Sequence, residues 1–156
     1  FQIMQLNFRI ILNVKEDVLR DIVIDSSTSL IEFSNIISTE FGFDSSEIST
    51  FHKTDDNWEQ LDEIKIFKID DKDEIMDNIP ISNFFILKND KLIFIYDFLN
   101  YWTFFIELHE VGDFINDDSK YVVINSVGEV PKDAPTNIFN VSDKMSETDF
   151  DDNQID

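Results

Sequence analysis

Residues 93–111, IFIYDFLNYWTFFIELHEV, are almost entirely apolar, yet they contain the carboxylates of Asp97 and Glu107. A carboxylate beside aromatic side chains can acquire a raised pKa, as general acids and bases in enzymes do. Asp97 also directly precedes a tight loop, where an aspartate commonly accepts hydrogen bonds from backbone amides. We prefer this loop role for Asp97 and interpret most of the segment as protein core.

Metal chemistry has few ligands available in this chain. There is no cysteine, and the two histidines, His52 and His109, are not spaced as a helix-borne zinc pair. A site would need the fold to bring both histidines together with carboxylates such as Glu107 or Asp133. The acid-rich segments lack the glycine and the glutamate that a calcium-binding loop requires. We therefore predict no bound metal.

Motifs for cofactor binding and nucleophilic catalysis are missing as well. The chain has three glycines, and it contains neither a glycine-rich phosphate loop nor a Gly-x-Ser-x-Gly turn. Trp102 is interpreted as a core anchor rather than as a platform for a ligand. The sequence predicts no cofactor.

The formal net charge of −21 over 156 residues is the strongest global feature. The twelve Lys and Arg residues are scattered, so we expect the chain to repel the phosphates of DNA and RNA. No apolar run reaches the roughly 18 residues of a membrane span, and no basic segment precedes a signal-like region. These features predict a cytoplasmic protein without direct nucleic-acid or membrane contact.

Hydrophobic periodicity predicts the elements that position these residues. Residues 4–12 alternate between apolar and polar side chains, and residues 19–25 are expected to return beside them as an antiparallel strand. Residues 29–42 have helical spacing, with Ser29 and Glu32 placed as a capping box and Gly42 able to end the helix in a left-handed conformation. Further expected elements are strands at 47–53 and 64–69, separated by a polar loop, and a short helix at 81–87 after Pro80.

The opening segment is expected to form a β-hairpin with a three-residue loop at 99–101. This register makes every cross-strand pair on one face apolar, which a two-residue loop at 99–100 would not achieve. The expected pairs are Phe98 with Trp102, Tyr96 with Phe104, Phe94 with Ile106, and Leu92 with Leu108.

A family resemblance is carried by three segments in order. YDFLNYW at 96–102 resembles the Tyr-Asp-Phe-Gly-Asp-x-Trp signature of the plasmid pRiA4b ORF-3-like family, also described as passenger proteins of an IS1096-type element. TSLIEFSNIISTEFGF at 28–43 is similar to the family's helix ending in Phe-Gly-Trp. VGEVPKDAP at 127–135 resembles its Gly-x-x-Pro-Pro-Glu-Asp segment. The resemblance implies a compact α+β fold and no particular activity.

This chain departs from the family pattern at several polar positions. Histidines common in the family are replaced here by Glu47, Ser49 and Phe104, and its Gly-Asp pair is Leu99-Asn100. The motif residues that remain are our candidate binding residues: Tyr96, Asp97, Trp102 and Asp133.

The sequence as a whole predicts a single α+β domain at 1–140, followed by an acidic flexible tail at 141–156. The expected sheet is mixed and mainly antiparallel, with an N-terminal ββα unit in a ubiquitin-like arrangement and a central β-hairpin. We expect a cytoplasmic accessory or protein-interaction domain, associated with mobile elements through the family name. The alternative is an enzyme or small-ligand-binding domain with a site around Asp97 and Asp133.

Overall fold

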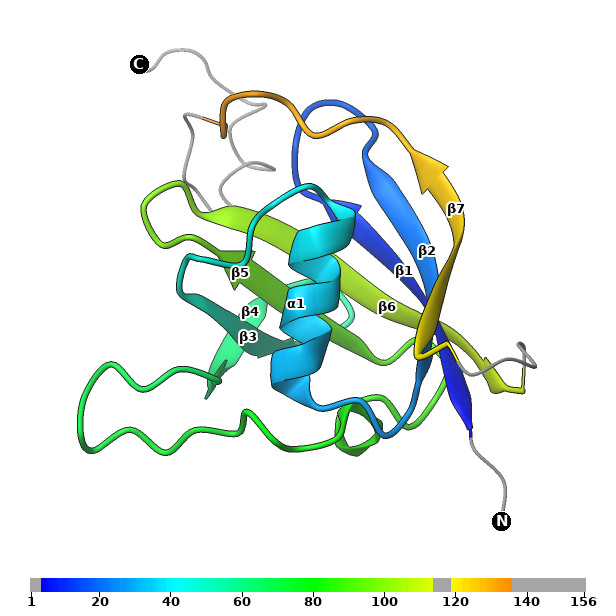
Figure 1. Cartoon of the computed structure of the whole chain (residues 1–156), viewed down its shortest axis with the longest axis horizontal. Coiled ribbons are helices and arrows are strands. Elements are labelled where there is room, and N and C mark those ends of the chain that lie inside the picture. The colour runs from blue at the N-terminus through cyan, green and yellow to red at the C-terminus, as the bar shows by residue number, and fades with distance from the viewer. Residues whose placement is uncertain (1–3, 114–118, 136–156) are drawn as a thin grey trace.

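The computed structural model describes residues 4–113 and 119–135. Seven antiparallel strands form one sheet in the order β4-β3-β5-β6-β1-β2-β7, and α1 lies across one face of it (Figure 1). The strands are β1 Gln5–Leu12, β2 Leu19–Asp25, β3 Ser49–Thr54, β4 Gln60–Lys65, β5 Lys91–Tyr96, β6 Trp102–Gly112 and β7 Tyr121–Val127. The helices are α1 Leu30–Glu40 and the short 3₁₀ helix η1 Ile81–Asn83.

The expected α+β class and mainly antiparallel sheet are confirmed. All six strand pairs among the described residues are antiparallel, so the expected mixed sheet was wrong in this part of the chain. A ubiquitin-like arrangement is not confirmed. The predicted acidic tail at 141–156 lies outside the described residues. Within those residues, no helix combines the length and apolar character needed to cross a membrane.

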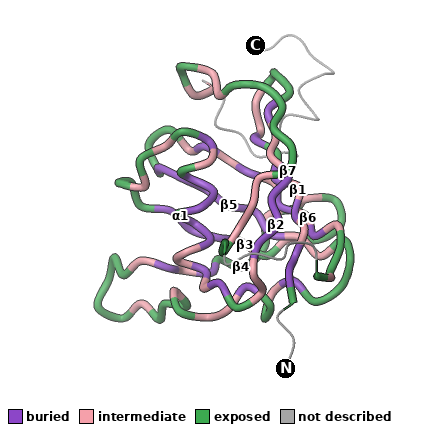
Figure 2. Tube along the Cα trace, turned by 45° about the vertical axis from the view of Figure 1, so that its right-hand side comes forward, coloured by how far each residue is buried: buried purple, intermediate pink, exposed green. Residues whose placement is uncertain are grey.

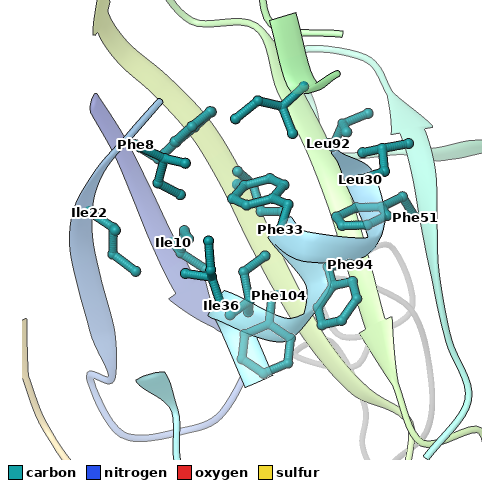
Figure 3. Packing of buried hydrophobic residues seen from close by; sticks show 14 of the residues in the cluster. Phe8, Ile10, Ile22, Leu30, Phe33, Ile36, Phe51, Leu92, Phe94 and Phe104 are labelled. Carbon is teal, nitrogen blue, oxygen red and sulfur yellow. The ribbon is translucent and has the colours of Figure 1, made fainter. Parts of the chain in front are cut away.

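The core lies between α1 and the sheet, and phenylalanine dominates it. Phe33 on α1 packs against Phe8 of β1 and Phe51 of β3, with ring centroids 5.1 Å and 5.8 Å away (Figure 3). Figure 2 shows that buried residues are concentrated in the strands and α1, whereas the connecting loops are mostly exposed. Burying aromatic side chains of this size supplies a large share of the hydrophobic stabilisation. Six of the largest fully buried side chains are phenylalanines: Phe8, Phe33, Phe51, Phe85, Phe94 and Phe104.

Both ends of α1 follow the sequence prediction. The Ser29 and Glu32 capping box is present, and Gly42 has a φ of +86° directly after the helix. The remaining free amides of the first turn, on Leu30 and Ile31, donate to the carbonyls of Ile79 and Asp77, each at 2.9 Å. Four orphan amides are expected at a helix N-terminus, and here the segment before η1 helps to satisfy them.

The central hairpin forms, but the predicted register was wrong by two residues. Tyr96 pairs with Trp102, and Phe94 pairs with Phe104, so the loop comprises residues 97–101. Asp97 has a φ of +65°, which ends the extended backbone of β5 two residues earlier than expected. A shift of two residues keeps every side chain on its predicted face, because side chains alternate with a period of two.

Other elements differ more from the prediction. β4 begins at Gln60, inside the segment expected to be a loop, and ends at Lys65. The helix expected at 81–87 is reduced to η1, and β7 was not predicted. The segment before β4 folds back against the opposite face of the sheet, where Trp58 packs 5.0 Å from Phe105. A pattern of alternation within a strand does not indicate such folding back.

Candidate functional site

The four residues predicted as candidate binding residues line one open cleft. Tyr96 ends β5, Asp97 begins the hairpin loop, Trp102 begins β6, and Asp133 lies in the segment after β7. The cleft has a volume of about 470 Å³. The fold therefore collects residues from two distant parts of the chain at one end of the helix-covered face.

Phe43, which follows α1, joins the aromatic side of the cleft. Its ring centroid lies 5.0 Å from that of Tyr96 and 5.1 Å from that of Trp102. Tyr96 and Trp102 are 3% and 6% exposed, so most of each ring belongs to the core. This burial agrees with the interpretation of Trp102 as a core anchor.

A polar network connects Tyr96 with the loop after α1. The Tyr96 hydroxyl donates to Asp44 Oδ1 at 3.0 Å, and the same oxygen accepts from Ser46 Oγ at 2.6 Å. The Ser46 bonds, and then the bond from Tyr96, hold the pKa of Asp44 below its usual value. The pKa of Tyr96 is raised, chiefly because burial disfavours the phenolate. The network therefore favours a charged Asp44 beside a neutral Tyr96.

Asp97 has the loop role that the sequence suggested. Its Oδ1 accepts from the Leu99 amide at 3.1 Å, and its Oδ2 accepts from Asn100 Nδ2 at 2.6 Å. The Tyr101 amide also donates to the Asp97 carbonyl at 2.6 Å. Asp97 thus stabilises the hairpin loop while its carboxylate still lines the cleft.

The segment 129–134 forms the other wall of the cleft and contributes Lys132, Asp133 and Ala134. It follows Gly128, whose φ is +75° and whose position leaves no space for a side chain, because an added Cβ would lie 2.0 Å from the Asp17 carbonyl oxygen. The Arg20 side chain also holds the end of β7 in place, because it donates to the carbonyls of Val127 and Gly128 at 3.0 Å and 3.1 Å.

A second cleft of about 510 Å³ adjoins the first. Both clefts are lined by Gly42, Phe43, Trp102 and Lys132, so they form neighbouring hollows along the segment 129–134. Arg20 and Glu40 line the second hollow, which the sequence did not indicate. An extended ligand therefore has a continuous surface available at this end of α1.

The histidines lie outside this arrangement. His52 pairs with Ile93, which pairs with Phe105, and His109 lies four residues further along β6. At ~3.4 Å per residue, this offset alone separates the histidines by about 14 Å, in addition to two strand spacings. Among residues 4–113 and 119–135, no group of three or more His, Asp or Glu side chains is placed to hold a metal ion.

The cleft is mainly acidic. Asp44, Glu47, Asp97 and Asp133 line it together with one lysine, Lys132, and no histidine is among its lining residues. Sequence reasoning missed Phe43, Asp44 and Glu47, although the polar stretch FDSSE directly after the helix-ending Gly42 was a signal that could have drawn attention to them. The arrangement presents an excess of carboxylates, which suits a positively charged group.

Comparisons with known proteins agree with this fold. A family model described as "Plasmid pRiA4b ORF-3-like protein" matches residues 2–137. No curated protein matches the chain. The crystal structure of a protein of unknown function from Methanosarcina mazei Go1 is similar, with a TM-score of 0.71 and 15% sequence identity, over 85% of this chain and 75% of that chain.

Proposed function

The chain belongs to the plasmid pRiA4b ORF-3-like protein family, and we propose that it is a non-catalytic interaction domain that binds a positively charged segment of a partner protein. The bound segment lies in the acidic cleft beside Tyr96 and Trp102. In keeping with the sequence analysis, we further propose a cytoplasmic accessory role, linked to mobile elements by the family name alone. The folded domain spans residues 1–140 in this proposal.

The observation that carries the proposal is the excess of carboxylates in a cleft with an aromatic side. Asp44, Glu47, Asp97 and Asp133 outnumber the single cation Lys132 there. The chain as a whole carries a net charge of −21, which attracts positively charged partners over distances of about one Debye length, ~10 Å at 0.1 M salt. A basic segment is therefore favoured during its approach and after it binds.

Binding is favoured over catalysis because the Asp97 carboxylate already accepts two hydrogen bonds within its own loop. A general base needs an oxygen or nitrogen within hydrogen-bonding reach of the proton that it abstracts. The cleft lining supplies no histidine, and its serine, Ser46, already donates to Asp44. These residues give the cleft its shape and its negative charge, but they do not form a nucleophile paired with a general base.

Isothermal titration of the full chain with an octalysine peptide tests the proposal. Neutralising the cleft by Glu47→Gln with Asp133→Asn is expected to weaken binding at least about fivefold. The matched control is Asp56→Asn with Asp71→Asn, which removes the same charge from exposed residues that do not line the cleft. Equal weakening in both double variants would contradict a specific site and leave only general attraction to an acidic protein.

The second candidate function is an enzyme or small-ligand-binding site around Asp97 and Asp133. It is favoured by the cleft volume of about 470 Å³, which lies within the ~300–1,000 Å³ of typical small-molecule sites. NMR screening with small protonated amines distinguishes the two candidates. Saturable chemical-shift changes centred on Tyr96 and Trp102 that persist at 0.5 M salt would favour a small-ligand-binding site.

A further inference from the structure

The tip of the β5–β6 hairpin presents apolar side chains to solvent. Leu99 is 90% exposed and Phe98 is 43% exposed. Ile48, also 43% exposed, adjoins the start of the loop, because its carbonyl accepts a hydrogen bond from the Asp97 amide at 3.0 Å. We call Ile48, Phe98 and Leu99 the tip surface. Leu99 has the largest exposed fraction among the large hydrophobic residues of the described chain.

Hydrogen bonds within the loop hold the backbone that carries Phe98 and Leu99. The Asp97 carboxylate accepts from the Leu99 amide and from Asn100 Nδ2, and the Asp97 carbonyl accepts from the Tyr101 amide. Ordering a flexible loop on binding costs free energy, so a loop that is already ordered binds more tightly for the same contacts. The backbone at Leu99 is therefore more ordered than that of a leucine in a flexible surface loop.

The tip surface alternates in sequence with the acidic cleft. Glu47 lines the cleft and Ile48 belongs to the tip; Asp97 lines the cleft, Phe98 and Leu99 belong to the tip, and Asn100 lines the cleft again. A partner seated in the cleft therefore reaches the apolar tip within a residue or two. We propose that the tip surface anchors an apolar side chain of the same basic partner segment whose cationic side chains enter the cleft.

This inference rests on the proposed function and specifies the partner as basic and amphipathic, with leucine-like residues among its lysines or arginines. Charge complementarity identifies a basic protein segment as the occupant, because Glu47 and Asp97 directly adjoin the apolar residues. A few well-packed side chains commonly carry most of the affinity of an interface, whereas surrounding charges set its orientation. An acidic partner would meet repulsion at the same place.

The test compares two peptides with equal charge, Ac-KLKKLLKKLK-NH₂ and the same peptide with serine at each leucine position, in isothermal titration against the full chain. We expect the leucine peptide to bind at least about tenfold more tightly, and Leu99→Ser to abolish that difference. Leu87→Ser is the matched control, because Leu87 is 68% exposed and does not line the acidic cleft. It is expected to leave both affinities unchanged.

The outcomes separate this inference from the proposed function. If the serine peptide binds as tightly as the leucine peptide, and both affinities depend on Asp133, the tip surface does not anchor the partner. The proposed binding of a basic segment in the acidic cleft is then retained. If the leucine peptide depends on Leu99 but not on Glu47 and Asp133, the cleft function is wrong. Failure of both peptides to bind overturns both. Leu99-dependent sedimentation with phosphatidylcholine vesicles would replace the protein partner by a lipid surface.

Discussion

The Tyr96 hydroxyl donates a 3.0 Å hydrogen bond to Asp44 Oδ1 and joins the end of β5 to the loop that follows α1. The two residues are 52 positions apart in sequence. Because Phe43 packs on the Tyr96 ring, the bond and the ring contact together hold that loop against the sheet. The shape of the acidic cleft therefore depends on the Tyr96 side chain.

Tyr96→Phe is expected to lower the free energy of unfolding by about 1 kcal/mol at pH 7, because it removes a part-buried hydrogen bond to the charged but exposed Asp44. The pKa of Tyr96 is raised in the folded state, first by burial. Its contribution to stability is thus fully present below the unfolded tyrosine pKa of about 10 and is lost as pH rises through the folded pKa. Urea unfolding between about pH 8 and pH 11 should show a smaller alkaline loss in the variant. An identical alkaline loss would mean that the phenol is not desolvated.

Gly128→Ala is expected to destabilise the protein much more than Gly42→Ala. Both glycines have positive φ, +75° and +86°, so alanine at either position costs about 1–2 kcal/mol of backbone strain. Only at Gly128 would the new Cβ also meet a backbone atom, the Asp17 carbonyl oxygen at 2.0 Å. Thermal unfolding of the two variants measures the difference, and similar melting temperatures would show that the chain after β7 moves away without cost.

Asp73→Asn is expected to destabilise the protein at pH 7 and to have little effect near pH 2. The bond from Lys65 Nζ, at 2.6 Å, and then the amides of Asp70 and Ile69 lower the pKa of Asp73 to about 2. A lowered folded pKa adds stability that is present above the unfolded value and is lost as pH falls toward the folded value. Urea midpoints at both pH values measure the effect, with Asp71→Asn as a control for charge alone. A difference that persists undiminished at pH 2 would contradict the assigned ion pair.

Asp97→Ala is expected to cost about 1 kcal/mol of stability, because the Leu99 amide and the Asn100 side chain lose the acceptor that holds the loop. Alanine also tolerates the φ of +65° less well than aspartate does. Hydrogen exchange at the Leu99 amide should accelerate in Asp97→Ala and much less in Asp97→Asn, which keeps one carbonyl oxygen. Unchanged exchange in both variants would argue against the loop role and free the carboxylate for a direct ligand contact.

The β5–β6 hairpin shows which features of the fold a sequence pattern can predict. Alternation places Phe94 and Phe104 on one face, but it cannot distinguish two registers that differ by two residues, because both give the same faces. The choice depends on the positive φ of Asp97 and on the hydrogen bonds inside the loop, which no periodicity encodes. The strand that contains Val122 and Val123 was missed although its apolar residues were visible in the sequence.

The candidate site was predicted in part for a similar reason. The motif resemblance singled out Tyr96, Trp102 and Asp133, and the fold places them in one cleft. Asp44 belongs to no motif, and Glu47 was noted only as a departure from a family histidine. Both reach the cleft because the loop after α1 turns toward β5. Long-range placement of a loop depends on tertiary packing, which local patterns do not determine.

The position of β1 between β2 and β6 affects how the chain folds during synthesis. β1 ends at Leu12, whereas its neighbour β6 is complete only at Gly112. At the ~5–20 residues per second of ribosomal synthesis, one edge of β1 stays open for roughly 5–20 s after Leu12 has been added. An unpaired strand edge is a template for pairing with other chains. The nascent protein is therefore most exposed to aggregation, and most in need of chaperones, while residues between Leu12 and Gly112 are still being translated.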